Sequence, residues 1–140
     1  FTDLNKFYDA NRRQYDANQI LEFLQNDLLN EQFRIIGLFR VDLFIPILTY
    51  IFGQAYFNGN VGAASIYRLR NEQYGMLAND ELLLDRFIKV IIHELGHTFG
   101  LVHCHSPECV MRSSTYVEDI DLKSHHLCRQ CHTKLHQQVG

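Results

Sequence analysis

The sequence predicts an α+β fold, in which a mixed and twisted sheet is backed by helices and followed by a small irregular C-terminal part. Two stretches, residues 17–30 and 80–99, repeat apolar side chains at helical spacing. Stretches rich in β-branched and aromatic residues lie between them, at 34–41, 47–57 and 63–70. After Gly100 the periodicity stops, and the chain becomes rich in cysteine and histidine.

Length and charge set the first limits. A chain of 140 residues buries roughly two-thirds of its unfolded surface, which is enough for one core. The net charge of −3 offers no basic field for nucleic acid or an anionic membrane. No run of 18 apolar residues is present to span a bilayer, and no signal peptide is visible. We expect one domain (1–140), made of an upper subdomain (1–100) and a lower subdomain (101–140), in a cytoplasmic monomer.

The first third of the chain predicts one helix and one strand. Residues 1–15 show no sustained period, and we expect an irregular lead-in. Asp16 is suited to cap a helix over 17–30. The apolar side chains on one face of that helix are Ile20, Leu21, Phe23, Leu24, Leu28 and Leu29. Residues 34–41 then predict a buried strand, which Asp42–Pro46 breaks.

The middle of the chain predicts two more strands. Residues 47–57 form one strand region, and Gly53 within it indicates a bulge or a close backbone approach. A turn is expected at 58–60. Residues 63–70 alternate moderately and predict the third strand, and 71–79 predict a polar loop.

The main helix carries the most informative motif. Asp80 is expected to cap it, and apolar residues cover most of its circumference, so it should be buried on more than one side. Its end reads HELGHTFGLVH, from His93 to His103. His93 and His97 lie one helical turn apart on one face, so their imidazoles can bind a single Zn²⁺ at about 2.0–2.1 Å.

The other residues of this motif suit a hydrolytic metal site. Glu94 is rotated by about 100° from His93, which places it beside the metal, where it can accept a proton from an attacking water. Gly100 tolerates a positive φ, so the helix can stop there and the chain can return His103 as a third ligand. A fourth position then stays open. Because HExxH alone often occurs by chance, the added Gly100 and His103 carry the metal interpretation.

The four cysteines form a second cluster. They are Cys104, Cys109, Cys128 and Cys131. In an extracellular protein their even number would allow two disulfides. Without a visible secretory signal a Cys₄ zinc site is favoured, and the final C-x-x-C is its strongest local indication, while unlinked thiols are a third possibility. Residues 101–131 hold little apolar material, so such a zinc would stabilise this segment.

The motif and the methionine eight residues after it resemble the metzincin clan of zinc metalloproteases. Three features narrow the resemblance to the archaemetzincin family: Cys104 directly after His103, the Cys109-Val110-Met111 sequence, and the Cys128-Arg129-Gln130-Cys131 sequence. The segments Tyr8–Tyr15 and Gly37–Pro46 are also similar to that family. In that family a strand–helix–strand unit usually precedes the part matched here, and Phe1 is not an initiator methionine, so the natural start can lie upstream.

The resemblance implies a metzincin-like fold and a zinc-dependent metallopeptidase. Two zinc ions are expected, a catalytic one on the three histidines, with Glu94 as general base, and a structural one on the four cysteines. Met111 is implied to lie in a tight turn beneath the three-histidine site without binding the metal. The substrate, a peptide or protein, is implied to lie extended along an edge strand at 51–57.

Two other functions stay open at this level. The first is a zinc-stabilised peptide-binding module with little or no turnover. The second is a Cys₄ nucleic-acid knuckle, suggested by basic residues near the cysteines: Arg112, Lys123, Arg129 and Lys134. The acidic balance argues against the knuckle, so neither a nucleic acid nor a membrane is expected as a partner.

Several residues near the motifs are given no role in catalysis. The remaining histidines are expected to be solvated: His105, His125, His126, His132 and His136. Some metzincins carry a tyrosine two residues after the methionine, but Ser113 stands at that position here, so no such role passes to Tyr116.

Overall fold

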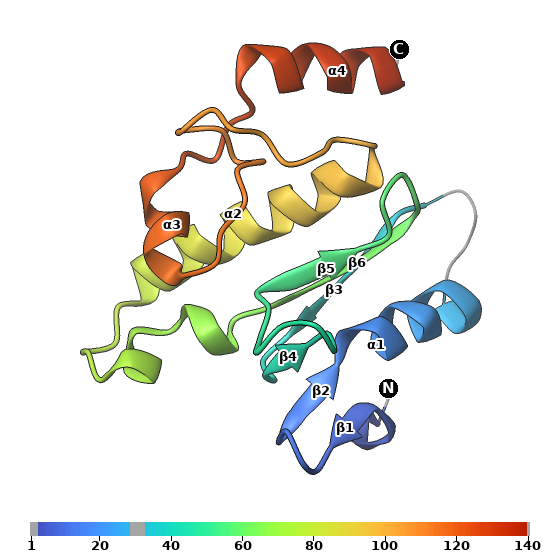
Figure 1. Cartoon of the computed structure of the whole chain (residues 1–140), viewed down its shortest axis with the longest axis vertical. Helices are drawn as coiled ribbons and strands as arrows, with labels where there is room; N and C mark the ends of the chain where they lie inside the picture. Colours follow the sequence, from blue (N-terminus) through green and yellow to red (C-terminus); the bar gives the residue numbers. More distant parts are fainter. Residues whose placement is uncertain (1–2, 29–32, 140) are drawn as a thin grey trace.

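The structure, a computed structural model, describes residues 3–28 and 33–139 (Figure 1). The strands are β1 (Tyr8–Asp9), β2 (Gln14–Asp16), β3 (Ile35–Phe39), β4 (Leu43–Phe44), β5 (Gly53–Ala55) and β6 (Val61–Ser65). The α-helices are α1 (Ala17–Phe23), α2 (Asp80–Thr98), α3 (Val117–Leu122) and α4 (Arg129–Val139). Short 3₁₀ helices are η1 (Leu4–Phe7), η3 (Tyr67–Leu69) and η4 (Asn71–Tyr74), and η2 (Leu24–Leu28) is a π-helical continuation of α1.

The strands form two small mixed sheets. In the central sheet, β6 lies between β3 and β5, parallel to β3 and antiparallel to β5. Among the described residues β5 is therefore an edge strand. In the second sheet β2 pairs antiparallel with β1 and parallel with β4, and a bridge between Leu43 and Ile51 adjoins it. The predicted mixed sheet is confirmed, although it is divided in two.

Helices cover both faces of the central sheet, α1 on one side and α2 on the other (Figure 1). The alternation of side chains along β6 explains this arrangement. Val61 and Ala63 pack in a cluster with Ile20 of α1, whereas Ala64 packs in a second cluster with Val90 of α2. All of these side chains are buried, so the sheet is the layer that fixes α2 in place.

The N-terminal segment is more regular than the sequence predicts, because η1 and the β1–β2 pair occupy it. The Asp16 cap is confirmed, since its Oδ1 accepts the N–H groups of Asn18 at 2.9 Å and Gln19 at 3.3 Å. The predicted helix over 17–30 is α-helical to Phe23 and π-helical to Leu28. Its last two predicted positions lie outside the described residues.

Two predicted strands differ from the observed ones in extent. Within 47–57 only β5 is a strand, because it pairs with β6 over three residues. The strand predicted over 63–70 begins at Val61 and ends at Ser65, and the chain then bends into η3, where Leu69 turns into the core. Local β propensity marks these stretches, but the pairing partner sets their length.

The start of α2 also differs from its prediction. Asn79, not Asp80, is the N-cap, because Asn79 has an extended backbone and its Oδ1 accepts the Leu82 N–H at 3.1 Å. Asp80 and Glu81 occupy the first turn instead, where their negative charges interact favourably with the positive end of the helix dipole.

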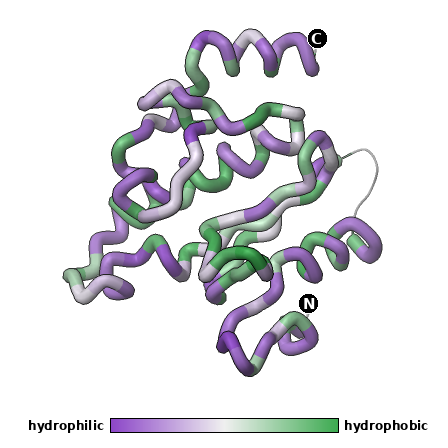
Figure 2. The backbone as a smooth tube through the Cα atoms, in the orientation of Figure 1, coloured by the Kyte–Doolittle hydropathy of each residue, from purple (hydrophilic) through white to green (hydrophobic). Residues whose placement is uncertain are grey.

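The C-terminal part contains more helix than predicted. The sequence gives no sign of α3, and α4 begins at Arg129 rather than near Thr133. α4 is mostly hydrophilic along its length (Figure 2). A separate small core of Leu101, Val110 and Met111 with two buried cysteines supports this part. Across residues 3–28 and 33–139, no helix has the length and apolar character needed to cross a membrane.

Candidate metal centres and active-site cleft

Gly100 ends α2 and turns the chain back, as predicted. Its φ of +85° lies in the left-handed region that glycine adopts without strain. The N–H groups of Gly100 and Leu101 donate to the carbonyls of His97 and Gly96, both at 3.0 Å, which satisfies the free carbonyls of the last turn. This turn carries the chain from the helix to His103.

The three predicted histidines come together at this turn. One ring nitrogen from each of His93, His97 and His103 lies within 4.8 Å of the others. The Nδ1 of His93 hydrogen-bonds to the Val110 carbonyl and the Nδ1 of His97 to the Leu101 carbonyl, both at 2.8 Å. A carbonyl oxygen can only accept a hydrogen bond, so each Nδ1 carries the ring proton and each Nε2 keeps a lone pair that can bind a metal.

The two free nitrogens face each other. The Nε2 atoms of His93 and His97 are 3.1 Å apart, close to the spacing of about 3.3 Å between two ligands on a tetrahedral zinc. Burial is the main cause that lowers the pKa of all three rings, that of His93 to about 3. Neutral imidazoles with opposed lone pairs repel each other unless a cation lies between them. The donor set therefore fits a zinc ion.

Glu94 lies beside this site, against the edge strand β5. Its side chain is buried, and burial raises its pKa to about 8, while the charge of Lys123 acts in the opposite direction. A Cβ atom at Gly53 would be 2.7 Å from the Glu94 Oε2 and 2.7 Å from the Ala63 carbonyl oxygen. The close approach predicted at Gly53 is confirmed, and both the Ala63 backbone carbonyl and the Glu94 carboxyl take part in it.

Met111 lies under the histidine helix. It is fully buried, and a Cβ atom at Gly96 would be 2.5 Å from its Sδ. The Met111 carbonyl accepts a hydrogen bond from the Cys104 N–H at 3.0 Å, and the neighbouring Val110 carbonyl accepts one from the Nδ1 of His93. The turn at Met111 thus orients one histidine through a backbone hydrogen bond.

A cleft of about 630 Å³ runs past the three histidines and Glu94. Residues 48–57, around β5, form one wall, and residues 113–116 form the other. Tyr50 joins the walls, since its hydroxyl donates to the Thr115 carbonyl at 3.0 Å. Tyr116 is exposed at the rim.

Sequence reasoning missed the position of Lys123, which it grouped with basic residues near the cysteines. Lys123 also lines the cleft, and its side chain is only 4% exposed. Its Nζ donates to the Arg112 carbonyl at 2.8 Å, and burial lowers its pKa to about 8. No local signal marks this residue, because α3 and the chain after it bring Lys123 under α2 only in the folded protein.

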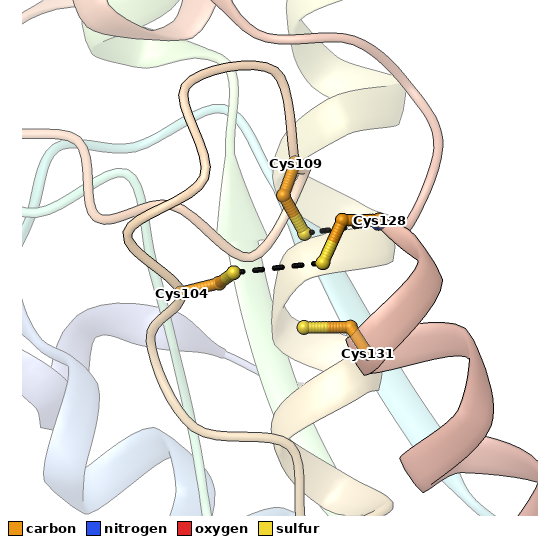
Figure 3. Close-up of side chains that lie close together, drawn as sticks. All are labelled: Cys104, Cys109, Cys128 and Cys131. Atoms are coloured by element: carbon orange, nitrogen blue, oxygen red, sulfur yellow. Dashed lines mark hydrogen bonds between the residues drawn. The ribbon is translucent and has the colours of Figure 1, made fainter.

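The four cysteines converge on one point (Figure 3). Their sulfurs all lie within 4.8 Å of one another, and all four cysteines are free. The Cys104 and Cys128 sulfurs are 3.7 Å apart, far beyond a disulfide bond of about 2.05 Å but close to the spacing of about 3.8 Å on tetrahedral zinc. The Cys131 N–H is the main cause that lowers the pKa of Cys128 to about 7, and it favours the thiolate.

None of the other histidines, all of which the structure describes, belongs to either cluster. His125 contacts Asp85 at 2.7 Å, and the exposed rings of His132 and His136 pack on each other along α4. His132 does not join the sulfur cluster beside it.

Comparison with known proteins gives consistent matches. A sequence model described as peptidase family M54 matches residues 2–137. The archaemetzincin of Pyrococcus horikoshii is 39% identical over 143 residues, which cover 98% of this chain and 75% of that protein. The crystal structure of the Methanopyrus kandleri archaemetzincin has a TM-score of 0.86 at 37% identity, covering 96% of this chain and 71% of that one. A zinc-dependent peptidase from Methanocorpusculum labreanum has a TM-score of 0.83 at 32% identity, covering 96% and 81%.

Proposed function

This chain belongs to peptidase family M54 together with the archaemetzincins and is a zinc metalloprotease, and we propose that it hydrolyses peptide bonds at the three-histidine site with Glu94 as general base. One observation carries this proposal above the others: the opposed Nε2 lone pairs of His93 and His97, 3.1 Å apart. His103 would complete the set of ligands.

In the proposed reaction, each residue has a defined task. Zinc, when bound by the three histidines, supplies a Lewis acid that polarises the substrate carbonyl and increases the acidity of water. Glu94 accepts the proton of the attacking water and then delivers it to the leaving amine. Burial raises the pKa of Glu94 above its ordinary value in the metal-free site, so this carboxyl binds a proton more readily than an exposed glutamate does, and it must then release that proton to the leaving amine.

The edge strand β5 supports a binding mode for the substrate. Within the part of the chain that the structure describes, β5 pairs with β6 on one side only, and its residues line the cleft. An extended peptide can therefore add to this edge with backbone hydrogen bonds. We place the substrate along 51–57, with its scissile carbonyl between Glu94 and the three histidines.

We propose a second, structural zinc on the four cysteines. Cys104 follows His103 directly, and Cys109 lies two residues before Met111, so this zinc would hold both flanks of the segment that orients the histidines. The proposed subdomains, 1–100 and 101–140, would then meet at the cleft. The expectations of a monomer and of a cytoplasmic location stay predictions.

Digestion of a peptide library, followed by mass spectrometry, tests the catalytic proposal. The zinc-loaded wild type should cleave peptides in a chelator-sensitive manner. Glu94→Ala should lose turnover but retain zinc, because Glu94 is not needed as a ligand. Glu81→Ala is the matched control, since Glu81 is exposed on the first turn of the same helix. A Glu94→Ala protein with full activity would refute the general-base role.

The peptide-binding module without turnover remains the second candidate. It predicts that the wild type binds peptides without cleaving them at any zinc loading. The nucleic-acid knuckle loses part of its support, because Lys123 is buried rather than part of a basic surface.

A further inference from the structure

Two polar groups in the cleft have no task in the proposed reaction. They are the ammonium of Lys123 and the hydroxyl of Ser114, and both residues line the same cavity as Glu94 and the histidines. Within residues 3–28 and 33–139, the Ser114 Oγ is the one buried side-chain oxygen or nitrogen without a hydrogen-bond partner. Buried polar groups are normally paired, so an orphan in a binding cleft points to a ligand.

In the described part of the chain, Lys123 also has no direct counter-ion, although the Glu94 carboxylate acts on its charge from a greater distance. An ammonium has three donors, and here one of them meets the Arg112 carbonyl. Among the described residues no carboxylate forms an ion pair with Lys123. A buried ammonium without a hydrogen-bonded ion pair costs free energy, so a carboxylate that enters the cleft and contacts it would be favoured there.

Neighbouring buried cations show that this is not a general property of the interface between α2 and α3. Lys89, equally buried, pairs with Asp85 at 3.1 Å and donates to the Ile120 carbonyl. Arg86, also buried, pairs with Asp121 at 2.8 Å. Both cations fasten α3 to α2, whereas Lys123 lines the cleft without such a pair.

The position of Lys123 and Ser114 in the cleft indicates which side of the substrate they contact. Ser114 belongs to the wall at 113–116, which Tyr50 joins through Thr115. Tyr50 precedes β5 in the chain. A peptide antiparallel to β5 therefore carries its C-terminal side, beyond the scissile bond, towards Tyr50 and this wall.

We propose that Lys123 and Ser114 form a carboxylate-binding subsite that recognises substrates with a carboxylate on the leaving-amine side of the scissile bond. The carboxylate is either an acidic side chain or the free C-terminus of the peptide. Its oxygens accept hydrogen bonds from the Lys123 ammonium and the Ser114 hydroxyl. This inference rests on the proposed peptidase function and adds a substrate class to it.

Matched peptides test the subsite. The best-cleaved library sequence is synthesised with Glu or Gln after the scissile bond and an amidated C-terminus. A second pair keeps Gln and ends in either a free carboxylate or an amide. The wild type should cleave one carboxylate form with a kcat/KM at least about tenfold above its neutral partner. The pair that shows the preference identifies the source of the carboxylate.

Variants connect the preference to the two residues. Lys123→Met should bring the carboxylate-to-neutral ratio close to one, Lys123→Arg should restore most of it, and Ser114→Ala should lower it several-fold. Lys89→Met is the control, because it removes an equally buried ammonium that does not line the cleft, and its ratio should match the wild type. If Lys123→Met slows the cleavage of both peptides of a pair equally, Lys123 only stabilises the backbone at Arg112 through its hydrogen bond, and the subsite is refuted.

A binding assay separates failure of the subsite from failure of the proposed function. If the zinc-loaded wild type cleaves no peptide, a hydroxamate that carries a succinyl carboxylate is compared with its succinamide analogue by calorimetry. Tighter binding of the carboxylate in the wild type, lost in Lys123→Met, supports the subsite without any turnover. Equal binding of the two compounds overturns it.

Discussion

Replacement of Glu94 by Gln should stabilise the fold at alkaline pH when the three-histidine site holds no metal. The carboxyl is buried against β5, and its pKa is raised from 4.5 to about 8 by that burial. In the unfolded chain it ionises near pH 4.5, whereas the folded protein keeps the proton until about pH 8. The unfolded state therefore binds fewer protons across this interval, and stability falls as the pH rises through it.

The size of the effect follows from the pKa difference. A change from 4.5 to about 8 corresponds to at most about 5 kcal/mol of folding free energy, fully developed above pH 8 and absent below pH 4.5. Gln resembles the protonated carboxyl in shape and does not ionise, so Glu94→Gln removes the penalty. The lowered pKa of His93 makes the fold less stable below pH 6.5, but this effect is common to both proteins and cancels in their difference.

Urea unfolding of both proteins at pH 5 and pH 8 measures this difference. A mild chelator first removes metal from the three-histidine site, and elemental analysis checks that the four-cysteine zinc is retained. The variant should exceed the wild type by less than about 1 kcal/mol at pH 5 and by about 4 kcal/mol at pH 8. Glu81→Gln, at an exposed position on the same helix, should change stability little at either pH. An equal difference at both pH values would refute the burial argument.

The other predictions concern the metals and the edge strand. Elemental analysis should find two zinc ions per chain after mild, chelator-free purification, and a count of no more than one would contradict the proposed pair of zinc sites. Cys128→Ser should lower the melting temperature and also weaken zinc binding at the histidines. His97→Ala should lose one zinc and keep the fold. Thermal melts with zinc counts would show the reverse pattern if the structural role belonged to the histidine site. Gly53→Ala should lower kcat about 100-fold with zinc still bound, because the new methyl group displaces Glu94. Unchanged kinetics would contradict that contact.

The parts of the fold that sequence predicts well depend on local physics. The helix that carries the histidines has a strong apolar period, and a single glycine with a positive φ ends it at residue 100. The offsets between His93, His97 and His103 are set by that helix and its turn. The prediction of a metal site from the C-x-x-C sequence also depends only on short-range geometry. Cys128 directly precedes α4 and Cys131 lies in the first turn of α4, so the two thiols are close in the chain and in space.

The parts that sequence misses depend on contacts between distant segments. α3 has six residues, and its underside meets Arg86 and Lys89 of α2, so its stability comes mainly from packing. The strand predicted over 63–70 alternates moderately along its whole length, but β3 pairs with it only to Ser65 and β5 only to Ala64. In the sequence nothing distinguishes Lys123 from a surface lysine, and only the packing of α3 in the folded protein places it at the cleft.

The two proposed metal sites share one short segment, and its backbone explains why the sulfur site should affect the histidine site. Between Cys104 and Met111 the chain returns on itself, and the Cys104 N–H donates to the Met111 carbonyl at 3.0 Å. Val110 lies between Cys109 and Met111, and its carbonyl fixes the Nδ1 of His93. A zinc on the sulfurs would therefore hold in place the carbonyl that orients the Nε2 of His93 towards the proposed catalytic metal. The loss of one thiolate should misalign an imidazole that it never touches.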